Sequence, residues 1–206
     1  MARSFFKIEG CSVFPNDWGD YGDILQHGMS SHQPRRNGSI SLERTGPYIP
    51  PVTFPGPIVL TTEARQLLES SGLSGLSFLP VVKAHIVELH WEEWDLNLDW
   101  PPKLPDSGEP EDYILAEPHN PGASDALGEL WEITVPKTGK IISPERITLS
   151  SLMRPYKGFS FDSSNWNGAD LFRSEGSGWM LCSERGRDWL TESWGRLLLF
   201  DPFPST

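Results

Sequence analysis

The sequence predicts an α+β fold with mixed, mostly antiparallel sheets, short helices and two similar strand–helix–strand lobes. Two observations support this prediction. Apolar or alternating runs of a length typical of strands recur along the chain, separated by stretches rich in turn residues. In addition, two segments far apart in the chain, residues 58–82 and 178–202, repeat one order of predicted elements. We therefore expect short elements joined by long connections.

The N-terminal quarter combines strands with irregular segments. Residues 5–14 alternate loosely and predict an edge strand, whereas residues 15–37 lack clear periodicity and predict an irregular segment or a short helix. Residues 39–44 alternate polar and apolar side chains, which is typical of a strand. The next segment, 46–57, holds five prolines, so we expect an extended chain without regular ladder hydrogen bonds.

The first strand–helix–strand unit begins with a short apolar strand at residues 58–60. Thr61 or Thr62 is a suitable N-cap for the helix that follows. Glu63 lies in the first turn of this helix, where the helix dipole favours an anion.

The same predicted helix takes its apolar stripe from Leu67 and Leu68 and ends at Gly72, which is a suitable C-cap. A second strand follows at residues 76–82. The apolar pattern continues beyond it, so we expect this strand to run on to residue 89.

The second unit has a strand at 178–181, a Ser-Glu helix start at Ser183 and Glu184, and a closing strand at 197–202. Both units end in Phe-x-Pro, and their registers agree apart from a one-residue gap inside the helix. An internal duplication or convergent packing explains the similarity. Two copies are too few for a solenoid.

Between the two units the chain is rich in Trp, Pro, Asp and Glu. Residues 91–120 are expected to be mostly irregular, with one ordered turn at 111–115. Residues 130–135 predict a strand, and residues 137–140 predict a turn that leads into an apolar pair.

A length of 206 residues fits a single domain, 1–206, with sub-lobes 1–120 and 121–206 as an alternative division. Only Cys11 and Cys182 are present, so neither a disulfide framework nor a clustered zinc site is predicted. The first residues lack the apolar run of a signal peptide, and no stretch approaches the length of a membrane span. We therefore expect a cytoplasmic protein without a membrane partner.

The net charge of −11 is concentrated in one segment. Residues 88–117 contain ten acidic side chains and one basic residue, Lys103, so this acidic segment carries −9 of the total. Such a field repels nucleic acids and anionic membranes and attracts basic proteins. The acidic segment is therefore either a solvated loop or a surface that binds a protein partner, and nucleic-acid binding is not expected.

Aromatic residues lie between these acids. Protein interfaces have this composition, because aromatic side chains act as anchors and charges at the rim set partner choice. Trp91, Trp94 and Trp100 are the candidate anchors. The residues predicted to contact a partner are Glu88, Trp91, Glu92, Glu93, Trp94, Asp95, Asp99, Trp100, Asp106, Glu109, Glu111 and Asp112. A ligand-binding module built on the tryptophans is an alternative.

No catalytic residue, metal ligand or cofactor is predicted. The histidines lack a metal-binding pattern, and neither a phosphate-binding loop nor a Gly-x-Ser-x-Gly elbow is present. An enzyme remains an alternative in two forms. Cys182 lies at a predicted strand-to-helix junction, where a helix N-terminus lowers a thiol pKa, although buried packing is the favoured interpretation. Carboxylates of residues 91–95 lie beside aromatic platforms, as in enzymes that cleave sugars.

Two stretches together resemble a known family. Residues 161–173, Phe-Asp-Ser-Ser-Asn-Trp-Asn-Gly-Ala-Asp-Leu-Phe-Arg, run towards residues 178–185, Gly-Trp-Met-Leu-Cys-Ser-Glu-Arg. This pair is similar to the C-terminal part of the double-CxxCG immunity proteins, which occur mainly in myxobacteria beside polymorphic toxins. Residues 60–63 with 71–76 also resemble the first αβ lobe of that family.

The chain departs from the family in its cysteines. It lacks both Cys-x-x-Cys-Gly pairs and has Gln-His-Gly-Met-Ser-Ser-His at residues 26–32. The structural zinc of the family is therefore not carried over to this chain.

The resemblance implies a single immunity-type domain that serves in bacterial competition. A protein of this kind acts stoichiometrically in the cytoplasm, binds its cognate toxin domain and needs no catalytic residues. Nuclease and deaminase toxins are commonly basic, because they bind nucleic acid. An acidic surface at residues 88–117 would reach such a partner quickly by electrostatic steering.

Overall fold

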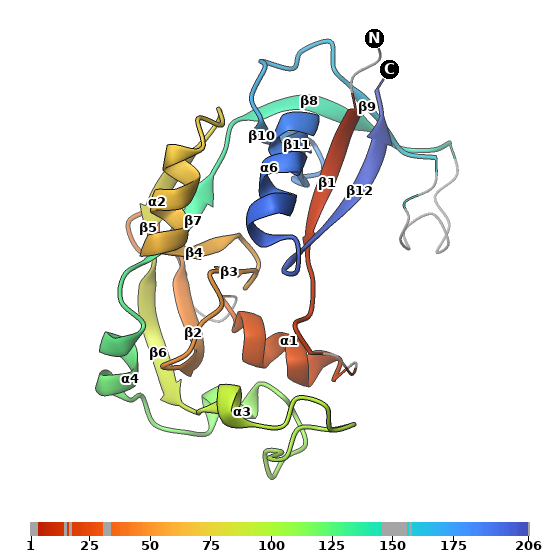
Figure 1. Cartoon of the computed structure of the whole chain (residues 1–206). Helices are drawn as coiled ribbons and strands as arrows, with labels where there is room; N and C mark the ends of the chain where they lie inside the picture. Colours follow the sequence, from red (N-terminus) through yellow and green to blue (C-terminus); the bar gives the residue numbers. More distant parts are fainter. Residues whose placement is uncertain are drawn as a thin grey trace. The chain divides into compact units, whose positions relative to one another are not determined.

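The computed structural model describes residues 4–14, 16, 18–30, 34–145, 156 and 158–205, and Figure 1 labels their elements. They form two compact units. Unit 1 takes its described residues from segments 1–11, 68–77 and 134–206, and unit 2 takes them from 12–67 and 78–133. Both units thus draw on separate stretches of chain, whereas the sub-lobes considered from the sequence are continuous.

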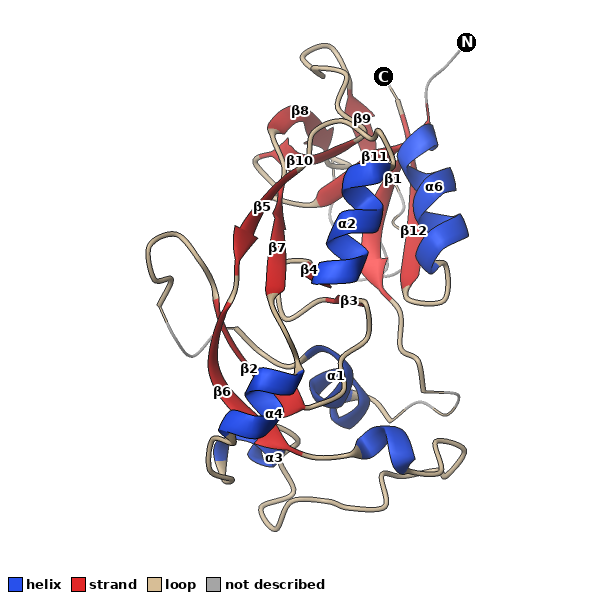
Figure 2. Cartoon of the chain, turned by 60° about the vertical axis from the view of Figure 1, so that its left-hand side comes forward, coloured by secondary structure: helices blue, strands red, loops and turns tan. Residues whose placement is uncertain are grey.

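The predicted fold class is confirmed. Short helices accompany mixed sheets whose strand pairs are mostly antiparallel, and long loops connect them (Figure 2). The α-helices among the described residues have 4 to 11 residues, so each of these depends on packing rather than on its own propensity.

Unit 1 is built on a six-stranded sheet. In spatial order its strands are β12 (Leu198–Pro204), β1 (Ser4–Gly10), β11 (Met180–Ser183), β10 (Leu171–Glu175), β8 (Lys137–Ile142) and β9 (Ser160–Asp162). Neighbouring strands are antiparallel except for β10 and β8, which run parallel. Helix α6 (Glu184–Trp194) connects β11 to β12 and packs on both of them and on β1 (Figure 1).

Strand β1 is central, so its predicted edge position is wrong. It pairs with β11 on one side and with β12 on the other. Successive side chains of a strand point to opposite faces, and Phe5 and Phe6 are both buried. The loose alternation of this segment therefore reflects a strand that is covered on both faces of the sheet.

Residues 137–140 belong to β8, so the predicted turn is wrong. Gly139 has a φ of +63°, and a Cβ atom at this position would lie 2.2 Å from Cζ of Phe161. Because Phe161 lies on the neighbouring strand β9, the glycine lets its ring pack against the backbone of β8. Gly139 thus marks a close approach between two strands rather than a turn.

Unit 2 contains two smaller sheets. One has the order β3 (Val52–Thr53), β4 (Val59–Thr61), β7 (Leu130–Thr134) and β5 (Ser77–Pro80). The other pairs β2 (Ser41–Gly46) with β6 (Val82–Glu88) in parallel. The boundary between the units falls within α2 (Thr62–Ser70) and at one end each of β5 and β7.

The first strand–helix–strand unit is confirmed as β4, α2 and β5. The Oγ1 atom of Thr61 caps the helix by accepting a hydrogen bond from the backbone N–H of Ala64, at 3.2 Å. Leu68 is fully buried, but Leu67 is exposed, so the apolar stripe is narrower than predicted. Gly72 follows the helix with a φ of +70°, the left-handed conformation that a helix C-cap favours.

Both strand–helix–strand units share one arrangement, as the sequence predicts. Helix α6 begins as α2 does, because the Oγ atom of Ser183 accepts a hydrogen bond from the N–H of Gly186, at 3.1 Å. In each strand–helix–strand segment, the two strands that the helix joins are separated in their sheet by one further strand. This strand is β7 between β4 and β5, and β1 between β11 and β12.

The single long strand predicted at 76–89 is two strands, β5 and β6, in different sheets. The backbone N–H of Val81 donates to the carbonyl oxygen of Leu130, and that of Val82 donates to Ile40, each at 2.9 Å. The chain therefore changes partner within two residues, directly after Pro80, which has no N–H to donate.

The described residues of unit 2 also form short helical elements: α1 (Asp20–His27), the 3-10 turn η1 (Trp91–Glu93), α3 (Asp112–Leu115) and α4 (Pro121–Ala126). Helices α3 and α4 contact the β2–β6 pair (Figure 2). An aromatic core forms between α1, β6, η1 and α3. It consists of Phe14, Trp18, Ile24, Leu25, Met29, Val87, Trp91, Tyr113 and Ile114. Of residues 26–32, Ser31 and His32 lie outside the described residues.

Candidate functional site

The acidic segment, residues 88–117, lies wholly within unit 2. It starts at the end of β6, passes through η1 and a long irregular loop, and ends just after α3 (yellow to green in Figure 1). Residues 91–120 are mostly irregular, as expected, and α3 occupies the ordered turn predicted at 111–115, but η1 is a second ordered turn that was not predicted.

Side chains from the N-terminal part of unit 2 hold this loop at two places. The indole N–H of Trp18 donates to the carbonyl oxygen of Leu98, at 2.8 Å. The hydroxyl of Tyr21 donates to the carbonyl oxygen of Gly108. The acids between these two attachment points are therefore presented on backbone that is tied to the core.

The three candidate tryptophan anchors differ in exposure. Trp91 is 2% exposed, and its ring packs against Phe14 and Tyr48 with centroids 5.3 Å and 4.9 Å apart. Its predicted role as an anchor is therefore corrected, because a side chain that fills the core cannot contact a partner. Trp94 is half-buried against the same aromatic core. Trp100, at 65% exposed, is the tryptophan that a partner can reach.

The predicted acidic contacts are mostly at the surface. Exposed members are Glu88, Glu92, Glu93, Asp95, Asp99, Asp106 and Glu109, and partly buried members are Glu111 and Asp112. Two of the exposed carboxylates flank His90, whose Nδ1 lies 3.2 Å from Oε1 of Glu92 and whose Nε2 lies 3.3 Å from Oε1 of Glu88. These two hydrogen bonds raise the pKa of His90 above its usual value.

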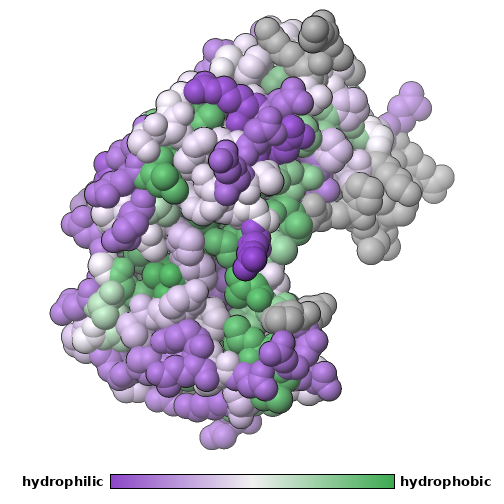
Figure 3. Space-filling model, viewed as in Figure 1, coloured by the Kyte–Doolittle hydropathy of each residue, from purple (hydrophilic) through white to green (hydrophobic). Residues whose placement is uncertain are grey.

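Apolar side chains are exposed among these acids. Seven large apolar residues of the described chain are prominently exposed, and four of them belong to the acidic segment: Leu98, Trp100, Leu104 and Leu115. Figure 3 shows green apolar atoms among purple hydrophilic ones at the lower end of the view, where α3 and the neighbouring loops lie in Figure 1. The acidic segment therefore forms a mixed surface of carboxylates and apolar groups rather than a uniformly solvated loop.

The three exposed leucines were not among the residues predicted from the sequence. In an irregular segment rich in proline, no periodicity separates a leucine that faces the core from one that faces water. Each of these leucines stands close to an acid or a proline in the sequence. That neighbourhood does not distinguish a leucine that faces the core from one that faces water.

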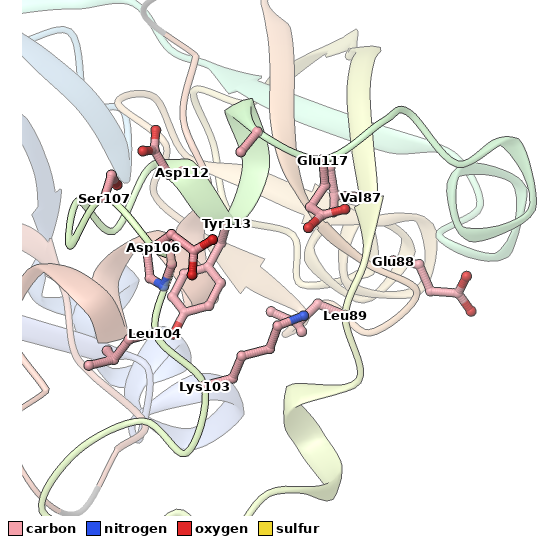
Figure 4. Close-up of a pocket in the computed structure, with 12 residues that line it drawn as sticks. Val87, Glu88, Leu89, Lys103, Leu104, Asp106, Ser107, Asp112, Tyr113 and Glu117 are labelled. Carbon is pink, nitrogen blue, oxygen red and sulfur yellow. The ribbon is translucent and has the colours of Figure 1, made fainter.

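A cavity of about 460 Å³ opens within the acidic segment (Figure 4). Three parts of the chain form its walls: the end of β6 with residue 89, the loop at 103–107, and α3 with the turn that follows it. Three of the predicted contact residues line it: Glu88, Asp106 and Asp112.

Cys182 lies in the core of unit 1. Its side chain is fully buried on β11, and its Sγ atom donates to the carbonyl oxygen of Phe6, at 3.7 Å. Burial raises the pKa of the Cys182 thiol far above its usual value. The thiol is therefore protonated and out of reach of a substrate, which argues against the nucleophile form of the enzyme alternative.

The described histidines make structural contacts. His27 is buried, which together with the charge of Arg44 lowers its pKa to about 4, and its Nδ1 accepts a hydrogen bond from Phe54 N–H, at 3.3 Å. Nε2 of His85 lies 2.9 Å from the carbonyl oxygen of Glu117. In the described part of the chain, no three side chains of His, Cys, Asp or Glu are grouped so that they could hold a metal ion.

Asp170, within the motif at residues 161–173, is a structural hub of unit 1. Its carboxylate accepts hydrogen bonds from the backbone N–H and the hydroxyl of Ser74, at 2.9 and 3.0 Å, and from the hydroxyl of Ser183, at 2.8 Å. The guanidinium of Arg185 lies 3.0 Å away. Burial alone would raise the pKa of Asp170, but these hydrogen bonds and Arg185 lower it below its usual value.

The chain matches no protein-family model, and no curated protein is significantly similar to it. Membership of the double-CxxCG immunity proteins therefore stays a prediction that rests on residues 161–173 and 178–185. Among the described residues, no helix has the length and the hydropathy that crossing a membrane would require.

Proposed function

We propose that this chain is a cytoplasmic immunity protein that binds and neutralises a cognate bacterial toxin domain through the acidic segment of unit 2. The observation that carries the proposal is the exposure of Trp100 and three leucines among closely spaced carboxylates. Four of the seven exposed large apolar side chains of the described residues fall in this one segment, and an exposed apolar patch marks an interaction site. The resemblance in residues 161–173 and 178–185 supplies the choice of a toxin as that partner.

The composition of this surface favours a basic protein partner. Trp100 provides an apolar anchor, and the surrounding carboxylates provide the charged rim that sets partner choice. A charge of −9 on one segment attracts a basic domain, such as a nuclease or a deaminase, and accelerates its association. The same field disfavours nucleic acid and anionic membrane as direct partners.

The alternative of a tryptophan-based ligand module finds less support. Trp91 and Trp94 pack into the aromatic core of unit 2, and within the part of the chain that the structure describes Trp100 makes no ring contact that could form a stacking platform. A titration of intrinsic fluorescence against sugars tests this alternative directly, and a saturable change would favour it over toxin binding.

Co-expression tests the proposed function. The C-terminal domain encoded by the neighbouring upstream reading frame is expressed in a bacterial host with and without this chain. We expect the domain to inhibit growth alone, and we expect growth to recover and the two proteins to co-purify when both are present. Toxicity that this chain leaves unchanged contradicts the proposal.

Charge reversal then tests the surface. The test variant replaces four exposed acids of the acidic segment by lysine: Glu92, Glu93, Asp95 and Asp99. The control variant makes the same change of net charge at four exposed acids elsewhere: Asp125, Glu129, Glu175 and Glu192. We expect the test variant to lose protection and co-purification and the control to keep both. Equal behaviour of the two variants would move the interface away from residues 92–99.

A further inference from the structure

The cavity in unit 2 has the size of a ligand pocket. Its volume of about 460 Å³ lies within the range of sites that hold small molecules. Apolar residues form much of its wall: Val87, Leu89, Leu104, Pro105 and the ring of Tyr113. Such a wall suits the aliphatic part of a ligand.

Three carboxylates at the pocket are available to a ligand. Asp106, Asp112 and Glu117 line it, and their side chains have no hydrogen-bond or ion-pair partner among the residues that the structure describes. Glu88 also lines the pocket, but its carboxylate is already engaged by Asn120, at 2.7 Å, and by His90. Figure 4 shows Glu88 pointing away from Tyr113.

Tyr113 provides a second and independent sign of a ligand. Its side chain is 4% exposed, and its hydroxyl is buried without a hydrogen-bond partner in the described structure. Burial raises the pKa of this hydroxyl, so it keeps its proton. Buried polar groups are nearly always paired in folded proteins, which makes an unpaired hydroxyl in a pocket wall notable. Figure 4 shows its hydroxyl end pointing towards Leu104, an exposed side chain of the loop.

Lys103 is the single cation in the pocket lining, and no partner for its ammonium group is found in the described residues. It opposes three available carboxylates, so the pocket keeps a net negative charge. The Lys103 charge repels a cationic ligand in this pocket, so its removal should strengthen the binding of such a ligand.

We propose that this pocket receives an arginine side chain of the protein partner, an inference that rests on the proposed function and adds its anchoring point. A guanidinium group has five N–H donors and no acceptor, and the pocket offers carboxylates and the Tyr113 oxygen as acceptors. Its planar fork pairs with carboxylates in a bidentate manner and stacks on an aromatic ring, whereas a lysine ammonium is a point charge. Because the hydroxyl end of Tyr113 points towards Leu104, its contact with the guanidinium requires the exposed Leu104 side chain to rotate.

The test uses the full chain and a defined probe, N-acetyl-arginine methylamide. N-acetyl-citrulline methylamide, a neutral compound of almost the same shape, is the matched control ligand. Binding is followed by backbone amide chemical shifts. We expect the arginine probe to shift residues 103–107 and 112–117 with a dissociation constant on the order of 1 mM, and citrulline to bind at least about tenfold more weakly, as expected on loss of a charge-assisted contact.

Variants of the pocket separate a binding role from a structural one. Tyr113→Phe should weaken arginine binding by about tenfold, the effect of one hydrogen bond to a charged group, while its melting temperature stays equal or rises because the unpaired hydroxyl is gone. Lys103→Gln should strengthen binding. Asp106→Asn should weaken it, whereas Asp99→Asn, at an exposed acid outside the pocket, should leave it unchanged.

Three results would overturn the arginine pocket: equal binding of citrulline, shifts spread evenly over residues 92–99, or unchanged binding in Tyr113→Phe. Because no toxin is used, the outcome is independent of the co-expression test. If the probe binds but the chain does not rescue growth, the arginine pocket is supported and the immunity function is contradicted. If the chain rescues growth but the probe does not bind, the immunity function is supported and the arginine pocket is contradicted.

Discussion

Asp170 concentrates four interactions on one carboxylate of unit 1, and its replacement should reveal how much they stabilise the fold. Asp170→Asn keeps the shape of the side chain but removes its charge and part of its capacity to accept hydrogen bonds from Ser74 and Ser183. We expect the free energy of unfolding to fall by about 1–3 kcal/mol, measured by urea titration. Asp188→Asn, at an exposed acid of α6, is the control and should change it by less than about 0.5 kcal/mol.

The same residue gives the variant a defined dependence on pH. Its pKa is lower in the folded protein than in the unfolded chain, so ionised Asp170 stabilises the fold above the unfolded pKa of about 3.9. This contribution is lost as the pH falls through the lower folded pKa. The difference in stability between wild type and Asp170→Asn should therefore be constant at neutral pH and shrink in acid. A difference that persists below both pKa values would show that charge is not its origin.

The tryptophans show what the sequence can and cannot predict for single residues. Trp91 and Trp100 lie in the same acidic and proline-rich composition, yet one is a core residue and the other is exposed. The difference depends on Phe14 and Tyr48, which are distant in sequence and reach Trp91 through the fold. The acidic character of the site was predictable from composition, but the distinction between its anchors was not.

At the scale of elements, the close approach of β8 and β9 leads to a direct prediction. Gly139→Ala should destabilise unit 1 by at least about 2 kcal/mol, because it adds a contact of 2.2 Å with Phe161 to the strain of a positive φ. Gly176→Ala is the matched control, since Gly176 also has a positive φ, +81°, but no atom within 4 Å of the added Cβ. Thermal unfolding of both variants separates the two effects, and equal losses would mean that strain alone accounts for Gly139.

Elements whose boundaries depend on local chemistry were predicted best. Helices α2 and α6 start where Thr61 and Ser183 offer a capping oxygen, and this signal lies within four residues of sequence. The central position of β1 and the change of partner at Val81 depend instead on strands from distant segments. A run of apolar side chains has the same pattern in the sequence whether it forms a strand in one sheet or strands in two. The sequence therefore did not predict the central position of β1 or the change of partner at Val81.

At the scale of the whole molecule, the uneven charge predicts how binding responds to salt. If the acidic segment steers a basic toxin domain, the association rate should fall by about tenfold between about 0.05 M and 0.5 M NaCl, whereas the dissociation rate changes less. Stopped-flow fluorescence measures both rates. An association rate that is independent of salt would show that the charge of −9 does not guide the partner.

The central place of β1 also bears on the order in which the protein can form during its synthesis. Residues 4–10 leave the ribosome early, but their neighbours in the sheet, β11 and β12, are made only at residues 180–183 and 198–204. All segments of unit 2 have been made once residue 133 is added. At ordinary elongation rates this is roughly 4–15 s before the last segment of unit 1 is complete. The surface proposed to bind the toxin thus belongs to the unit whose chain is synthesised first. Strand β1 can pair with β11 and β12 only after both have been synthesised.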